Sequence, residues 1–160
     1  MEKIDSFKVD HTKLLRGIYV SRKDYLSKGD VVTTFDLRMK EPNREPAIGQ
    51  AAIHTIEHLG ATYLRNHATW GDKVVYFGPM GCCTGFYLLL SGDLMPKDIL
   101  SLVTEMFVFI STYSGEIPGA SAHDCGNYML NNLPMANWEA RKYLKEVLEC
   151  MSDANMVYPS

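Results

Sequence analysis

Polar and apolar residues alternate from residue 31 to residue 39, so side chains of the two kinds point to opposite sides of an extended chain. One side carries Val31, Thr33, Phe35, Leu37 and Met39, and the other carries Val32, Thr34, Asp36 and Arg38. This alternation predicts a half-buried strand. Asp36 and Arg38 are then neighbours on its polar face, where a solvated residue or a surface ion pair is the ordinary interpretation.

Continuous apolar runs predict two more strands, at residues 74–77 and 86–90. The segment between them, residues 78–85, holds three glycines and a proline in eight residues. Such a backbone can turn tightly and approach a ligand, so the loop should present Cys82 and Cys83 at a sheet edge rather than in the core. Residues 127–133 could form a last strand.

Apolar residues at helical spacing predict three helices, at about residues 50–66, 96–115 and 134–151. The first ten residues show no strong period, so an arm and an edge strand both fit them. Together these elements predict an α+β domain in which a mainly antiparallel sheet packs helices on one face.

Composition limits the classes of protein that the chain can represent. With 160 residues, 46% apolar and 22% charged, the chain is large enough to bury one hydrophobic core but too short for two domains of ordinary size. We therefore interpret residues 1–160 as a single domain. A net charge of -3 without a dense Lys/Arg block argues against a nucleic-acid partner. The sequence has no run of about 18 apolar residues and no signal-peptide core at its start, so we expect no membrane contact and a cytoplasmic location.

His54-Thr-Ile-Glu57-His58 carries the strongest chemical signal. On a helix, at about 100° per residue, the three polar side chains project at relative angles of about 0°, 300° and 40°, so they converge. Two imidazoles at this spacing can share a metal, and the carboxylate beside them can move protons, as in the inverted zincin motif H-x-x-E-H. A solvated helix face is the alternative, but the neighbouring apolar residues place all three side chains on the border of a buried face.

A catalytic metal site needs a third protein ligand and an open position. The spacing leaves the third ligand open among Cys82, Cys83, His123, Asp124, Cys125, His11 and His67. The cysteines, which include Cys150, should be reduced thiols because nothing in the sequence indicates secretion. Thiolates bind Zn²⁺, Fe²⁺ and Co²⁺ strongly, so a cysteine is the leading candidate.

Several motifs occur in a fixed order along the chain. They are Ser6-Phe-Lys-Val-Asp-His11, Phe35-Asp-Leu-Arg38, Pro42-Asn43, His54-Thr-Ile-Glu57-His58, Pro79-Met-Gly-Cys82, Thr84-Gly85 and Cys125-Gly126. In order and spacing they resemble the LuxS family of S-ribosylhomocysteine lyases. The resemblance spans residues 4–149.

The resemblance implies roles for particular residues. His54, His58 and Cys125 would hold the metal, Glu57 and Cys82 would be the catalytic pair, and Ser6, His11 and Arg38 would contact the substrate. It also implies one divalent metal per subunit, with Fe²⁺ expected and Zn²⁺ or Co²⁺ as alternatives. The implied fold is LuxS/metallohydrolase-like, with sheets paired in a homodimer that has shared active sites.

The implied reaction cleaves the thioether of S-ribosylhomocysteine to homocysteine and dihydroxypentanedione, the precursor of a bacterial quorum-sensing autoinducer. The carbonyl migrates along the ribose, and a β-elimination then expels homocysteine, with Glu57 and Cys82 as the acid/base groups. The chain departs from many relatives at Tyr76, Gly78 and Cys83, where Asp, Ser, and Gln or Arg are usual. These differences leave the implied chemistry in place but change the contacts that are expected with the ribose.

Two other functions fit the helix motif. A small inverted-zincin metallopeptidase would use Glu57 to activate a metal-bound water, but it would take a carboxylate as its third ligand. A non-catalytic metal-binding module would close the site with a fourth ligand and leave no exchangeable water. Release of homocysteine without peptide cleavage separates the lyase from the peptidase.

Overall fold

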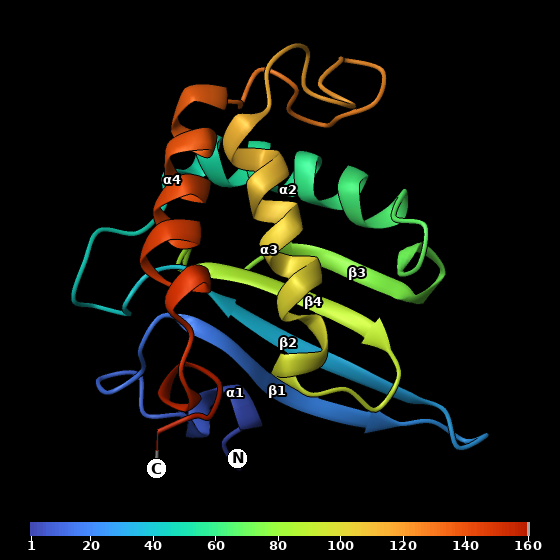
Figure 1. Cartoon of the computed structure of the whole chain (residues 1–160), viewed down its shortest axis with the longest axis vertical. Coiled ribbons are helices and arrows are strands. Elements are labelled where there is room, and N and C mark those ends of the chain that lie inside the picture. The colour runs from blue at the N-terminus through green and yellow to red at the C-terminus, as the bar shows by residue number, and fades with distance from the viewer. Residues whose placement is uncertain (160) are drawn as a thin grey trace.

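The computed structural model of the protein describes residues 1–159, and within them four strands form a single antiparallel sheet in the order β1-β2-β4-β3. The strands are β1 (Gly17–Tyr25), β2 (Val31–Arg38), β3 (Val74–Pro79) and β4 (Gly85–Ser91). The longer helices are α2 (Gln50–Arg65), α3 (Pro96–Thr112) and α4 (Leu133–Glu146). They pack on one face of the sheet (Figure 1), so the α+β class and the mainly antiparallel sheet are confirmed.

The core lies between these helices and the inner face of the sheet. Phe35 and Leu37 of β2 are fully buried in it, as the alternation of the strand predicts. The rings of Phe77 in β3 and Phe86 in β4 stack with centroids 4.9 Å apart, directly beneath the helices. This face of the sheet therefore provides a rigid support for α2, the helix that carries His54 and His58.

The outer face of β2 is buried as well, although the sequence predicted a half-buried strand with solvated polar residues. Asp36 is 1% exposed and Arg38 is 3% exposed. The prediction was wrong here because β2 is an interior strand, and the aromatic side chains of Tyr19 and Tyr158 cover its outer face. The two residues do form an ion pair, but a buried one.

Some element predictions need correction. β1 was not predicted, because Ile18 and Tyr19 are both buried and hide the alternation of the strand. Residues 127–132 form a turn and an irregular segment instead of a strand, and Leu133 already begins α4. Asn132 caps this helix by accepting a hydrogen bond from the Met135 amide at 3.1 Å. The last helix ends at Glu146, and a 3-10 turn, Leu148–Cys150, follows it.

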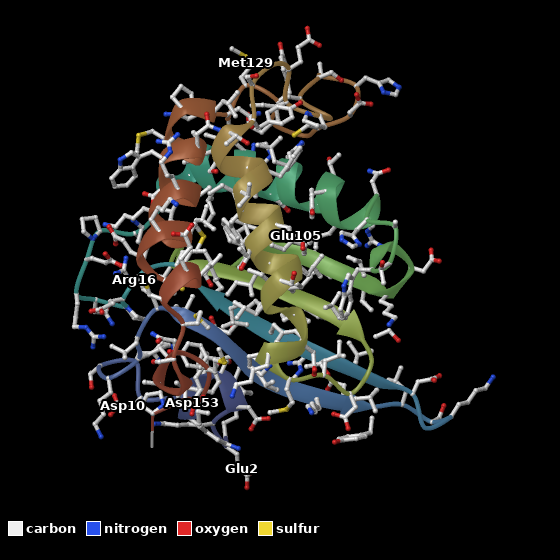
Figure 2. All side chains as sticks on the ribbon, in the orientation of Figure 1. Glu2, Asp10, Arg16, Glu105, Met129 and Asp153 are labelled. Carbon is white, nitrogen blue, oxygen red and sulfur yellow. The ribbon has the colours of Figure 1, made fainter. Side chains whose placement is uncertain are left out.

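The short helix α1 (Asp5–Lys8) occupies the start of the chain, where the sequence left an arm and an edge strand open. Figure 2 shows Met129, in the loop before α4, and Asp153, in the segment after it, at opposite ends of the long axis of the molecule. No helix within residues 1–159 is long and apolar enough to cross a membrane.

Candidate active site

The two histidines of α2 face each other across one turn of the helix. Their rings meet edge to face with centroids 4.5 Å apart, and the Nε2 atoms of His54 and His58 lie 3.0 Å apart. The opposite side of α2 is anchored in the core by Ile56 and Leu59, both fully buried. The helical spacing of the sequence therefore does place the two imidazoles together on the border of a buried face.

Backbone carbonyls from the loop between α3 and α4 orient both rings. The Nδ1 atom of His54 lies 2.5 Å from the Leu130 oxygen, and that of His58 lies 2.7 Å from the Pro118 oxygen. A carbonyl can only accept, so each Nδ1 carries the proton and each Nε2 presents its lone pair. This arrangement is the usual outer support of a metal-binding histidine.

Cys125 from the same loop completes the cluster. Its Sγ lies 3.5 Å from His54 Nε2, and the ligand atoms of His54, His58 and Cys125 all lie within 4.8 Å of one another. Two nitrogen lone pairs 3.0 Å apart repel each other unless a proton or cation lies between them. The residues fit a metal, because a His/His/Cys set suits Zn²⁺, Fe²⁺ or Co²⁺.

The hollow around this cluster, here called the metal hollow, has a volume of about 480 Å³. Glu57 and Asp124 line it together with the three clustered residues. Among the other candidates for the third ligand, His123 projects into solvent with its side chain 95% exposed, and His67 Nδ1 accepts amide hydrogen bonds from its own turn. Cys125 is thus the candidate that the fold brings to the two histidines.

Ser6, His11, Arg38 and Cys82 line a second hollow of about 450 Å³, here called the arginine hollow. The remaining lining residues are Phe7, Pro42, Asn43, Glu45, Ala47, Met80, Gly81, Thr84 and Tyr87. The residues that the resemblance assigns to substrate contact therefore do meet in space, and Cys82 lies among them. His67 and Cys150 line neither of the two hollows.

Arg38 is held in a fixed position inside the arginine hollow. Its Nε and Nη2 atoms donate to the two carboxylate oxygens of Asp36, at 3.0 and 2.6 Å. Burial opposes the charge of Arg38, but the Asp36 carboxylate more than offsets this effect, so the pKa of Arg38 is raised. The guanidinium stays charged, and its Nη1 remains available to other groups.

The free side of Arg38 faces the Cys82 thiol. Nη1 donates to the Thr84 hydroxyl at 2.7 Å and lies 4.0 Å from the Cys82 sulfur, while the Thr84 hydroxyl lies 3.1 Å from the same sulfur. A cation and a hydroxyl therefore lie beside the Cys82 sulfur. The sequence did not predict a role for Thr84 or Asp36 in the site, although Asp36 was expected on the same strand face as Arg38.

The adjacent cysteines differ from each other. Cys82 is exposed, whereas Cys83 has φ of 59° and is half-buried against the core without being part of it. Both lie in the loop between β3 and β4, at the sheet edge where the sequence predicted them. Tyr76 and Gly78, two positions at which the chain was expected to differ from many relatives, depend on each other. A Cβ at Gly78 would lie 1.9 Å from the Tyr76 hydroxyl oxygen, so the glycine leaves the space that the tyrosine fills.

Comparisons with known proteins show which family the chain belongs to. A family model described as S-Ribosylhomocysteinase (LuxS) matches residues 4–154. An S-ribosylhomocysteine lyase from Phocaeicola vulgatus is 63% identical over 160 residues, which are 100% of this chain and 99% of the relative. Lyases of the same name from Porphyromonas gingivalis and Desulfotalea psychrophila are 60% and 59% identical, over 99% and 100% of both chains. This chain therefore belongs to the LuxS family of S-ribosylhomocysteinases.

Proposed function

We propose that this chain cleaves the thioether of S-ribosylhomocysteine and releases homocysteine and dihydroxypentanedione, an autoinducer precursor. The observation that carries the proposal is the cluster of His54, His58 and Cys125 beside Glu57, in a chain that matches the LuxS family over residues 4–154. The relatives named above are S-ribosylhomocysteine lyases and align over nearly their whole length.

The first stage moves a carbonyl along the sugar. Each shift removes a proton from one carbon and delivers a proton to its neighbour, so acid/base groups must reach more than one position. We assign this work to the Glu57 carboxylate of the metal hollow and the Cys82 thiol of the arginine hollow. When held by His54, His58 and Cys125, a divalent metal, for which we propose Fe²⁺ with Zn²⁺ or Co²⁺ as substitutes, supplies Lewis acidity.

The last stage is a β-elimination. A base removes the proton from the carbon between the carbonyl and the carbon that bears sulfur. The electron pair forms a C=C bond while the C–S bond breaks, and homocysteine leaves as a thiolate that then takes up a proton. Glu57 and Cys82 suffice for these transfers, because each can return a proton that it has accepted.

Ser6, His11 and Arg38 are the residues that we propose for substrate binding. They line the arginine hollow, whose volume of about 450 Å³ suits a small polar substrate. Because Asp36 already fixes the guanidinium, Arg38 can offer a charged donor to the substrate without first reorganising. The serine hydroxyl and the imidazole add donors and acceptors for the sugar hydroxyls.

We further propose a homodimer with shared active sites. Among residues 1–159 the two hollows have no lining residue in common, so within one chain Glu57 and Cys82 face separate spaces. A second copy can bring the arginine hollow of one chain to the metal hollow of the other. The likeness to metallohydrolases stays a prediction, supported by an H-x-x-E-H helix packed over an antiparallel sheet.

Release of free thiol from S-ribosylhomocysteine by anaerobically purified protein tests the proposed function, with the metal content measured on the same sample. We expect one thiol per molecule of substrate consumed, loss of release after chelation, and recovery when Fe²⁺ is added back. Cleavage of a peptide substrate instead would favour the metallopeptidase. Metal-loaded protein that releases no thiol would overturn the lyase and favour a metal-binding module.

A further inference from the structure

The segment after α4 returns toward β1 (Figure 1), and its Tyr158 stacks on Tyr19 of that strand. Its 3-10 turn, Asp153–Asn155, is held to the chain just before β1, because the Asn155 amide donates to the Arg16 oxygen at 2.9 Å. The Tyr19 hydroxyl lies 3.4 Å from the Ala154 oxygen. These contacts fix the segment close to the outer side of β2.

Tyr158 is the residue of this segment that reaches the polar centre of the sheet. Its ring stacks on Tyr19 with centroids 4.8 Å apart and an interplanar angle of 14°. Its hydroxyl donates to the Oδ2 atom of Asp36 at 2.8 Å. Burial and the nearby Asp36 carboxylate raise the pKa of Tyr158, so the phenol keeps its proton and remains a donor.

Asp36 therefore has partners on two sides. Its Oδ2 atom accepts from Tyr158 and also from Arg38 Nη2, at 2.6 Å, and its Oδ1 accepts from Arg38 Nε. Beyond this pair, Arg38 Nη1 faces Thr84 and Cys82. A continuous series of polar contacts thus joins the end of the chain to the exposed thiol.

The phenol changes how Asp36 acts on Arg38. A donor on Oδ2 withdraws part of the negative charge of the carboxylate and fixes its orientation, so more of the positive charge of Arg38 is left to act on Cys82. Without that donor, Asp36 would neutralise Arg38 more fully and could rotate. The positive charge that lies beside the Cys82 sulfur would then be weaker and less well placed.

We propose that Tyr158 is a positioning residue, which acts through Asp36 to hold Arg38 at Cys82. The proposal deepens the proposed function, since it matters to turnover only if Cys82 is an acid/base group. The arrangement itself can be tested without turnover, because the reactivity of the thiol reports its surroundings.

The test compares Tyr158→Phe with Tyr19→Phe. Both variants keep the two stacked rings and lose one phenolic oxygen, but only the first loses the hydrogen bond to Asp36. The second loses the bond to the Leu15 oxygen and the longer contact with the Ala154 oxygen, while Asn155 still holds the segment to Arg16. The rate at which iodoacetamide alkylates Cys82, located by peptide mass spectrometry, should fall about tenfold in Tyr158→Phe and change by less than about twofold in Tyr19→Phe. Metal content should stay unchanged in both, and the unfolding midpoint should fall modestly in both, because each variant loses one part-buried hydrogen bond.

A double-mutant cycle with Asp36→Asn shows whether the effect passes through the carboxylate. In the Asp36→Asn background, Tyr158→Phe should lower the alkylation rate by less than about twofold further, because the acceptor has lost its charge. A wild-type alkylation rate in Tyr158→Phe, or an equal fall in Tyr19→Phe, would overturn the proposal. Wild-type protein that releases no homocysteine would overturn the proposed function alone, since the alkylation rates still decide the role of Tyr158.

Discussion

Two thiols in this chain have different surroundings and should respond differently to substitution. Cys125 lies 3.5 Å from His54 Nε2, whereas Cys82 lies beside Thr84 and Arg38. We expect Cys125→Ala to lose the metal and Cys82→Ala to keep it but lose turnover. Metal analysis and thiol release, measured on both purified variants, check this prediction.

Cys150→Ala is the matched control, because this exposed thiol lies 3.8 Å from the Lys145 oxygen and lines neither hollow. It should keep both metal and turnover. Full metal in Cys125→Ala together with a metal-free Cys82→Ala protein would reverse the assignment of the two thiols.

Glu57 is expected to transfer protons, whereas the residues beside it are expected to hold the metal. Glu57→Gln keeps the size of the side chain and removes its ability to take up a proton. We expect metal binding to persist and turnover to fall by about 10²-fold or more, the usual scale for one acid/base group. Turnover at the wild-type rate in a metal-loaded Glu57→Gln protein would exclude this residue as the base.

At the scale of residues, the sequence predicted those contacts that follow from short spacing along the chain or from a family motif. His54 and His58 are one helical turn apart, so the pattern alone predicted their convergence, and the resemblance added Cys125. The contacts of Arg38 could not be predicted in the same way, because Thr84 is 46 residues away. Tyr158 is 122 residues from its acceptor Asp36, and only the folded chain brings them together.

Among the secondary-structure elements, the contact between α2 and β3 determines how firmly α2, the helix that carries His54 and His58, is held. A Cβ at Gly60 would lie 2.4 Å from Cε1 of Phe77, whose ring cannot turn freely because it stacks on Phe86. We expect Gly60→Ala to lower the free energy of unfolding by about 1–2 kcal/mol, even after alanine gains roughly 1 kcal/mol of helix propensity. Denaturant titration of the purified variant measures the change.

Gly81→Ala serves as the comparison for this substitution. A Cβ at Gly81 would meet no atom within 4 Å, so the variant should be at least as stable as the wild-type protein. If Gly60→Ala were as stable as Gly81→Ala, the Phe77 ring would be free to move, and the close packing of α2 on β3 would not be needed.

Elements with a clear period or a continuous apolar run were predictable, and β1, which has neither, was not. The alternation at residues 31–39 gave β2, but burial of Ile18 and Tyr19 on opposite faces hid β1. Residues 127–133 were wrongly predicted as a strand. Their asparagines instead serve the neighbouring helices, since Asn131 accepts from Thr55 of α2 at 2.8 Å and Asn132 caps α4.

At the scale of the whole molecule, the division of the polar residues between two hollows predicts how a dimer should behave. The metal hollow contains Glu57, and the arginine hollow contains Arg38 and Cys82. If each active site combines the metal hollow of one chain with the arginine hollow of the other, a dimer has two composite sites. Arg38→Ala or Glu57→Ala then damages both sites of its own homodimer.

A heterodimer of these two variants should regain activity. One site receives intact Glu57 from the first chain and intact Arg38 from the second, while the other site collects both defects, so activity should approach half of the wild-type value. The control pairs Arg38→Ala with Cys82→Ala, which lie in the same hollow, 4.0 Å apart at Nη1 and Sγ, and so leave a defect in each composite site. That pair should remain inactive. If native mass spectrometry confirms the first heterodimer and it shows no recovery, Arg38 serves the metal site of its own chain.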